Sequence, residues 1–334
     1  MKNENTRPRV GFLGVGWIGR HRMEAMLATG AIEAAAIGEP AEEAAREAAS
    51  LAPEAKLVAS LEEMLALEPD GVVIATPSAL HAEQSIAALE AGAAVFCQKP
   101  LGRDAREARA VVEAARRADR LLGVDFSYRL TAAVEAIRPL IAEGRLGRIH
   151  AIDLVFHNAY GPDKPWFRDR ALAGGGCVMD LGVHLIDLAL WLLGDAEPVG
   201  VSAHLFAGGE PVGPETEAVE DHALATLAFA NGAVARLACS WWLHAGQEAV
   251  IAADFFGTEG AASMRNVNGS FYDFTAEHMT GTGRRTLAEP PDAWGGRAAA
   301  DWARRLAAGE RYDPQAEHLV KVAETMDRIY GCVR

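Results

Sequence analysis

Three ionisable side chains recur along an otherwise apolar segment in the middle of the chain. Asp180, His184 and Asp187 have the spacing i, i+4 and i+7 among Leu, Ile, Val and Ala residues. This spacing places all three on one face of a helix, which we expect over residues 177–193. Such groups are costly on an apolar face unless they have partners. They therefore indicate either an acid–base site or a buried polar network. No metal is expected, because the H-E-x-x-H pattern is missing.

A lysine stands directly after a short apolar run in the first third of the chain. Lys99 lies in Gln98-Lys99-Pro100, which follows the run Ala94–Cys97. If that run is a parallel strand, its carboxyl end borders the crevice in which open α/β sheets bind their ligands. Lys99 is therefore a candidate active-site residue, and an ordinary solvated loop lysine is the alternative.

A glycine-rich turn near the N-terminus has the spacing of a dinucleotide-binding fingerprint. The segment Gly14-Val15-Gly16-Trp17-Ile18-Gly19 reads G-x-G-x-x-G and follows the apolar run Val10–Leu13. The first glycine allows a tight bend, the second lets a pyrophosphate approach, and the third permits close helix–strand packing. The N-terminus of the following helix then faces the phosphates. The residues predicted to hold the dinucleotide here are Gly14, Gly16, Trp17, Ile18 and Gly19.

An acidic residue twenty positions after Gly19 bears on the choice of dinucleotide. Glu39 ends the second strand pattern, where a carboxylate binds the ribose 2′-hydroxyl of NAD and repels the 2′-phosphate of NADP. The alternative is an acid favoured by the dipole of the helix that opens near Pro40. We expect NAD as the cofactor, with NADP less favoured.

The elements that must position these residues differ between the two parts of the chain. Over residues 1–127, short apolar runs alternate with helical patterns, which is typical of βαβ units and a parallel sheet. Later strands are longer and amphipathic, and Asn231-Gly232 predicts a two-residue hairpin. We therefore predict an α/β protein with an N-terminal Rossmann dinucleotide-binding domain over 1–127. Residues 128–334 are expected to form an α+β domain with a large, mostly antiparallel open sheet, for substrate binding and oligomerisation.

Composition and charge exclude several classes of protein. Half of the 334 residues are apolar, which excludes a disordered chain, and the net charge of −14 argues against nucleic acid or an anionic membrane as a partner. Cys97, Cys177, Cys239 and Cys332 are far apart, so neither a zinc ribbon nor a disulfide framework is expected. The polar N-terminus predicts no secretory signal, and the apolar stretch 178–193 is expected to be too short to span a bilayer. We expect a soluble, cytoplasmic protein.

Together these motifs resemble those of the Gfo/Idh/MocA oxidoreductases, which include glucose–fructose oxidoreductase and inositol dehydrogenase. The resemblance spans essentially the whole chain. It implies hydride transfer between a nicotinamide cofactor and a sugar, cyclitol or related polyol, and a homodimer or homotetramer built on the C-terminal sheet. The segments that carry it are Gly14–Gly19, Ala75–Ser78 with Leu80-His81, Gln98–Pro100, Gly123–Arg129 and Gly174–Asp187.

The resemblance also implies roles for individual residues. Lys99 matches the lysine of the family's E-K-P motif, and Asp180 and His184 match its D-x-x-x-H pair. Two segments depart from the family pattern: Gln98 replaces the usual glutamate, and Trp166-Phe167-Arg168-Asp169 replaces W-R-x-D. Beyond the glycine turn and Glu39, the residues expected to bind the cofactor are Thr76, Pro77, His81, Gln98 and Lys99. The residues expected to bind the substrate are Tyr128, Arg129, Tyr160, Trp166 and Arg168.

These residues suggest how a carbinol would be oxidised. Histidine side chains ordinarily titrate near neutrality, so His184 would take the hydroxyl proton. Asp180 would orient the imidazole or relay its proton, and Lys99 would stabilise the developing alkoxide. Two alternatives stay open: a non-catalytic dinucleotide-binding sensor or co-regulator on the same fold, and a reductase of a non-sugar carbonyl. A sensor has no need of all three reacting groups, so their presence favours the enzyme.

Overall fold

The computed structural model describes residues 7–213 and 216–332, which form two compact units. The first contains residues 7–102, 106–125 and 296–320, and the second contains the other described residues. The chain passes to the second unit after Asp125, two residues before the predicted boundary. Gly296–Val320, which the prediction assigned to the second domain, belongs to the first unit.

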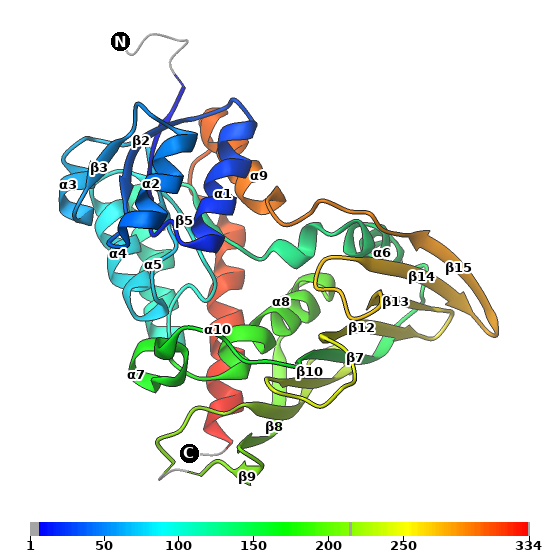
Figure 1. The fold of residues 1–334 in the computed structure, drawn as a ribbon. Helices are drawn as coiled ribbons and strands as arrows, with labels where there is room; N and C mark the ends of the chain where they lie inside the picture. The colour runs from blue at the N-terminus through cyan, green and yellow to red at the C-terminus, as the bar shows by residue number, and fades with distance from the viewer. Residues whose placement is uncertain (1–6, 214–215, 333–334) are drawn as a thin grey trace. The chain divides into compact units, whose positions relative to one another are not determined.

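A six-stranded parallel sheet forms the centre of the first unit (Figure 1). Its strand order, β3-β2-β1-β4-β5-β6, is the doubly wound order of dinucleotide-binding domains, so the predicted fold class is confirmed. The strands are β1 (Arg9–Leu13), β2 (Glu33–Gly38), β3 (Lys56–Val58), β4 (Gly71–Ile74), β5 (Ala94–Cys97) and β6 (Leu122–Val124). The helices are α1 (Trp17–Ala28), α2 (Glu42–Leu51), α3 (Leu61–Leu65), α4 (Ser78–Glu90), α5 (Ala105–Ala118) and α9 (Arg297–Ala307).

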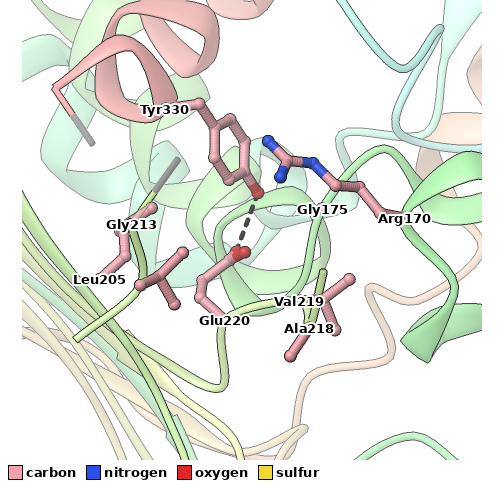
Figure 2. Close-up of a pocket in the computed structure, with 9 residues that line it drawn as sticks. Arg170, Gly175, Leu205, Gly213, Ala218, Val219, Glu220 and Tyr330 are labelled. Atoms are coloured by element: carbon pink, nitrogen blue, oxygen red, sulfur yellow. Dashed lines mark hydrogen bonds between the residues drawn. The ribbon is translucent and has the colours of Figure 1, made fainter. Parts of the chain in front are cut away.

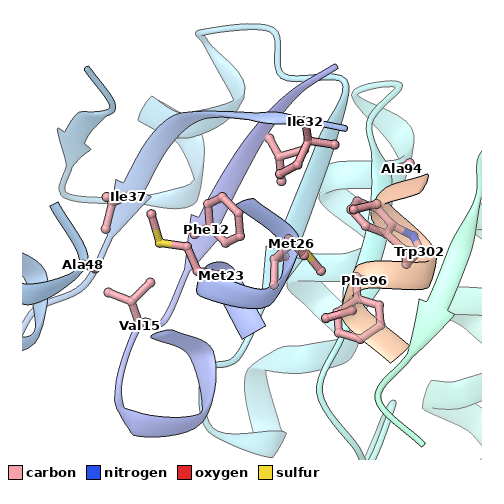
Figure 3. Close-up of a cluster of buried hydrophobic side chains, with 14 of the residues drawn as sticks. Phe12, Val15, Met23, Met26, Ile32, Ile37, Ala48, Ala94, Phe96 and Trp302 are labelled. Atoms are coloured by element: carbon pink, nitrogen blue, oxygen red, sulfur yellow. The ribbon is translucent and has the colours of Figure 1, made fainter. Parts of the chain in front are cut away.

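Helix α9 packs beside α1 and supplies a large side chain to the core of this unit. Trp302 is 2% exposed, and its ring centroid lies 5.8 Å from that of Phe96 (Figure 3). Gly71 and Gly123 make room for the indole, because a Cβ atom at either position would lie 2.7 Å from it. The parallel sheet is therefore covered in part by a helix from the far end of the chain.

A nine-stranded sheet forms the centre of the second unit, with the order β15-β14-β13-β12-β7-β11-β10-β8-β9. Strands β7 and β11 pair in parallel and every other pair is antiparallel, which confirms the predicted mostly antiparallel sheet. The strands are β7 (Ile149–Asn158), β8 (Pro198–Ala207), β9 (Glu210–Pro211), β10 (His222–Phe229), β11 (Val234–Ser240), β12 (Ala249–Gly257), β13 (Ala261–Asn266), β14 (Phe274–Thr280) and β15 (Gly283–Ala288).

Helices cover one face of this sheet. Helix α6 (Ala132–Ala142) packs on β13, β14 and β15, and α8 (Val183–Leu192) packs on β7. Two further helices are α7 (Arg170–Ala173) and α10 (Glu317–Gly331), the latter beginning in the first unit. The helical stretch Arg170–Leu192 is long and apolar enough to cross a membrane, but 89% of its most apolar window is buried inside the protein. It is thus built as a core helix.

The turn between β10 and β11 differs from the predicted two-residue hairpin. Phe229 and Ala233 close the ladder, since the Phe229 N–H donates to the Ala233 carbonyl at 2.9 Å. Three residues, Ala230, Asn231 and Gly232, therefore form the loop, and Gly232 has φ +84°. Only its last position needs the left-handed region, which is the pattern of a three-residue hairpin.

Candidate active site

The glycine-rich turn joins β1 to α1 as predicted. Gly14 has φ +83°, and a Cβ atom there would lie 2.6 Å from the Ala75 backbone. A Cβ atom at Gly19 would lie 2.1 Å from the Gly14 carbonyl oxygen. At Gly16 the same atom would meet open space, and among the described residues no side chain caps the N-terminus of α1. Open backbone before an uncapped helix fits the pyrophosphate of a dinucleotide.

Glu39 follows β2 and reaches back to that turn. Its Oε2 accepts a hydrogen bond from the backbone N–H of Val15 at 2.9 Å, and its Oε1 accepts one from Ala41 at 3.0 Å. The second bond lies at the start of α2, and the first places the carboxylate beside the glycine turn. Both roles weighed for Glu39, opening the helix and binding a ribose, are compatible with this position.

A buried polar cluster surrounds the glutamine that replaces the family's usual glutamate. Gln98 Nε2 donates to Asp125 Oδ2 at 2.7 Å, and Arg22 Nε donates to the same oxygen at 2.6 Å. All three side chains are at most 9% exposed. A glutamate at position 98 could not donate this bond while ionised, so the amide is matched to its acidic neighbour. The half-buried Lys99 comes next in the chain.

His81 links two backbone segments of the first unit, one at Thr76 and the other at Pro100. Its ring nitrogens lie 2.7 Å from the Thr76 carbonyl oxygen and 2.6 Å from that of Pro100. Burial lowers the pKa of His81, and a neutral ring donates to only one of the two oxygens at a time. Thr76 Oγ1 in turn donates to Gln84 at 2.6 Å. Thr76, Pro77, His81, Gln98 and Lys99, all predicted to bind the cofactor, thus belong to the first unit together with the glycine turn.

In the second unit, a buried carboxylate binds the start of the helix that carries the predicted acid–base residues. Glu220 accepts hydrogen bonds from the backbone N–H groups of Gly176 and Val178, each at 3.0 Å. It also accepts one from the Tyr330 hydroxyl at 2.8 Å (Figure 2). A Cβ atom at Gly176 would lie 1.8 Å from the Glu220 carbonyl oxygen. Burial raises the pKa of Glu220, and this effect outweighs that of the hydrogen bonds, which lower the pKa. The glycines therefore permit close contact between this turn and Glu220.

The predicted helix over residues 177–193 is not uniform. A π-helical turn, Val178–Gly182, precedes the regular helix α8. As a result, the three ionisable side chains predicted to share one face meet different neighbours. Asp180 lies in the π-helical turn, where its Oδ2 accepts a hydrogen bond from Trp241 Nε1 at 3.1 Å. π-Helical turns of this kind are frequent at functional sites.

His184 lies one turn later within a group of aromatic rings. It is 9% exposed, and its ring centroid lies 4.8 Å from that of Tyr128 and 6.4 Å from those of Phe126 and Phe156. The rings fix the imidazole laterally and limit its contact with water.

The third member of the stripe, Asp187, binds an arginine that was expected to bind substrate. Arg129 donates to it through Nε, at 2.8 Å, and through Nη2. Asp187 is 1% exposed, so the bidentate pair ties α8 to the segment after Phe126. Asp187 therefore fits the buried-network interpretation. The predicted role of Arg129 toward substrate stays a prediction, although its charge is already engaged.

Further aromatic and cationic side chains come from the loop after β7. Trp166 stacks on Phe167 with ring centroids 3.8 Å apart, and the Arg168 guanidinium lies 5.5 Å from the centre of the Trp242 ring. Tyr160 is 48% exposed. Their predicted part in substrate binding is untested by these contacts.

Two residues of the second unit were missed by sequence reasoning, namely Trp241 and Glu220. They contact the Asp180 segment from 61 and 44 positions away in the sequence. Neither follows a motif. The sequence indicated only that three ionisable side chains on an apolar helix need polar partners from other segments of the chain.

Comparison with protein families gives two matches along the chain. Residues 8–126 match the model described as oxidoreductase family, NAD-binding Rossmann fold, and residues 134–263 match the GFO/IDH/MocA C-terminal domain. The first unit thus contains an NAD-binding Rossmann fold.

Individual relatives and solved structures agree with these matches. The chain is 36% identical to the 1,5-anhydro-D-fructose reductase of Ensifer adhaerens over 64% of its length, and spans about three-fifths (62%) of that relative. It is 31% identical to a putative UDP-kanosamine synthase oxidoreductase subunit of Amycolatopsis mediterranei, over 77% of this chain and 75% of the relative. A structure of levoglucosan dehydrogenase with NADH and levoglucosan superposes with a TM-score of 0.83 at 26% identity, covering 98% of this chain and 97% of that one.

Proposed function

The chain belongs to the Gfo/Idh/MocA oxidoreductase family, and on that premise we propose that it transfers a hydride between NAD and a secondary carbinol of a sugar, anhydro-sugar or cyclitol. The observations that carry the proposal are the dinucleotide turn of the first unit and, in the second unit, the Asp180 and His184 side chains. A structure similar to this chain holds NADH and levoglucosan, an anhydro-sugar, which supports the substrate class.

The residues of the first unit bind the cofactor and assist the substrate oxygen. The N–H groups at the start of α1 receive the pyrophosphate, and Glu39 receives the ribose hydroxyls. When bound, NAD supplies the nicotinamide ring that accepts the hydride. Lys99 donates to the substrate oxygen and stabilises its alkoxide character as the proton leaves.

The residues of the second unit move the proton. His184 takes the proton of the reacting hydroxyl, and Asp180 orients the imidazole or relays that proton. The aromatic rings around His184 hold it in place. In the reverse direction, His184 returns a proton to the carbonyl oxygen. Tyr160, Trp166 and Arg168 are proposed to contact the hydroxyl-rich substrate, and Tyr128 to hold His184 through the contact between their rings.

Turnover with a defined panel tests this function. Purified protein with NAD or NADP is mixed with glucosides, levoglucosan, 1,5-anhydroglucitol and inositols, and absorbance at 340 nm is followed. We expect reduction of NAD by at least one of them and a lower kcat/KM with NADP, because Glu39 repels the extra phosphate. Binding of NAD without turnover on any compound, in either direction, would instead support the sensor.

Two substitutions test the roles of the reacting groups. Lys99→Ala should lower kcat by about 10²–10³-fold with little change in NAD affinity, and His184→Ala should lower it by about 10²–10⁴-fold. Exposed residues of the same types, Lys56 and His150, provide matched alanine controls that should leave kcat unchanged. Loss of NAD binding in Lys99→Ala with kcat retained would reassign Lys99 to the cofactor.

We also propose that a second copy of the chain covers the face of the nine-stranded sheet opposite α6 and α8. That face is hollowed and carries Ser202, His204, Thr226 and Arg236, together with Leu224, which is 44% exposed. Light scattering after size exclusion measures the mass directly. A monomer at micromolar concentration would exclude this assembly.

The cytoplasm is the compartment that the thiols favour. Cys97, Cys177, Cys239 and Cys332 form no disulfide, and the Cys239 thiol donates a hydrogen bond to the Cys177 sulfur at 3.8 Å. Adjacent reduced thiols are typical of a reducing compartment.

A further inference from the structure

The indole of Trp241 makes direct contact with one member of the acid–base pair. Trp241 Nε1 donates to Asp180 Oδ2 at 3.1 Å. The tryptophan directly follows β11 and is 3% exposed, and its backbone N–H donates to the Asp221 carbonyl at 2.7 Å. Backbone and ring are therefore both fixed, so the donor meets the carboxylate in one geometry.

Neighbouring rings hold this indole at its edges. The Phe167 ring stands nearly perpendicular to it, at 89° with centroids 6.5 Å apart, and the Trp242 ring stands at 74° and 5.8 Å. Edge-to-face contacts of this kind limit rotation of the ring. On the other side of the bond, Asp180 stands in the π-helical turn whose start is held by Glu220. Donor and acceptor are thus anchored to adjacent residues of one segment, Asp221 and Glu220.

The chemistry of the donor restricts what the carboxylate can do. An indole N–H can only donate, so it stabilises Oδ2 as an acceptor and disfavours a proton on that oxygen. The same bond sets the plane of the carboxylate and leaves Oδ1 as the more basic oxygen. A donor fixed on one oxygen therefore orients the whole carboxylate.

We infer that Trp241 is a positioning residue that holds the Asp180 carboxylate through Oδ2 and so fixes its orientation for the proton transfer proposed for Asp180 and His184. This inference rests on the proposed function, in which Asp180 and His184 carry the proton. It assigns Trp241 an effect on turnover through Asp180 alone, and not through packing of the sheet.

A spectroscopic measurement shows whether the bond exists in solution, independently of activity. The chain has seven tryptophans, so protein labelled with ¹⁵N at the indole gives a small set of resonances, and the Trp241 resonance is the one lost in Trp241→Phe. In Asp180→Ala, we expect the Trp241 indole proton to move upfield by roughly 1 ppm and to exchange faster with water, as the charge-assisted bond is lost. An unchanged Trp241 resonance in Asp180→Ala would overturn the inference, whatever the enzyme turns over.

A double-substitution cycle tests the consequence for turnover. Trp241→Phe keeps an aromatic ring but removes the N–H, and we expect kcat to fall by about 10-fold with a smaller change in KM, the scale of one hydrogen bond to a charged group. In the Asp180→Ala background, the same change should alter kcat by less than about 2-fold.

The matched control is Trp294→Phe, which removes another buried indole whose N–H donates to the Tyr272 carbonyl at 2.8 Å. Its effect on kcat, whatever its size, should be the same factor in the native and Asp180→Ala backgrounds. Equal factors for Trp241→Phe in both backgrounds would show that it acts through packing and would overturn the inference. If the native protein turns over no compound of the panel, the proposed function fails, and the indole resonance alone decides whether Trp241 holds Asp180.

Discussion

The side chain at position 98 shows how one substitution is accommodated by its neighbours. Relatives of this type usually carry glutamate before the lysine, and here Gln98 donates to Asp125, which also accepts from Arg22. The negative charge in this cluster resides on Asp125, and the amide supplies the donor that a carboxylate cannot. The negative charge that Gln98 lacks is therefore present on its hydrogen-bond partner, Asp125.

Gln98→Glu should therefore destabilise the protein. It replaces a donor by a second carboxylate beside Asp125, so we expect a loss of about 1–3 kcal/mol in the free energy of unfolding at pH 7. The deficit should shrink toward pH 4, where one carboxyl gains a proton and can donate again. Thermal unfolding at several pH values measures it. Gln98→Glu combined with Asp125→Asn, which restores a donor–acceptor pair, should recover part of the loss, and equal stability of Gln98→Glu and the native chain at pH 7 would contradict the argument.

Elements whose signals are local could be predicted from the sequence, and those fixed by distant contacts could not. The strands β1, β4 and β5 are almost wholly buried apolar runs, and the glycine turn follows from steric needs within a few residues. Strand β3 is three residues long and largely exposed, so it leaves no apolar run. The π-helical turn at Asp180 and the hydrogen bond from Trp241 to Asp180 depend on residues far apart in the chain. The hydrophobic periodicity of the sequence does not indicate such contacts.

A half-buried histidine near the end of β7 links this strand to β11. His157 Nδ1 lies 2.8 Å from Ser240 Oγ, which joins β7 to β11, and its ring stacks on that of His222 with centroids 5.7 Å apart. Burial lowers the pKa of His157 from 6.5 to about 4, and the nearby His222 contributes a smaller part of this shift. Because the folded state disfavours the charged ring, His157 contributes stability above pH 6.5 that is lost as the pH falls toward 4.

Denaturant unfolding between pH 7 and 4 measures this contribution. The native chain should lose more stability over that window than His157→Gln, so the two curves should converge or cross at low pH. Parallel curves would mean that the pKa of His157 in the folded chain is close to that in the unfolded chain. His150→Gln, at an exposed position of the same strand, is the control and should run parallel to the native chain.

At the scale of the whole molecule, the first unit is discontinuous in sequence. Its core includes Ala299, Trp302 and Ala303 from α9, packed with residues of β1, β5 and α1. A fragment ending at residue 127 would lack Trp302. Phe96 would then lose its indole neighbour, and the space that the indole fills beside Gly71 and Gly123 would be empty. Voids of this size lower stability by several kcal/mol, as in other large-to-small changes.

Residues 1–127 alone should therefore fail to unfold cooperatively. We expect weak near-ultraviolet circular dichroism and little NAD affinity, and both should return when residues 296–320 are fused through a flexible linker. The same fusion with Trp302→Ala, which keeps the helix but not the ring, is the control and should restore neither. A fragment 1–127 that melts sharply and binds NAD as the full chain does would contradict this.

The place of Trp302 in the chain also has a consequence for biosynthesis. The glycine turn leaves the ribosome early in synthesis. Trp302, which completes the core of the same unit, emerges only after nearly the whole second unit has been made. A nascent or prematurely terminated chain thus exposes an unfinished apolar core around Phe96. Exposed core of this kind is what chaperones and proteases bind, so we expect tight NAD binding only from chains that include α9.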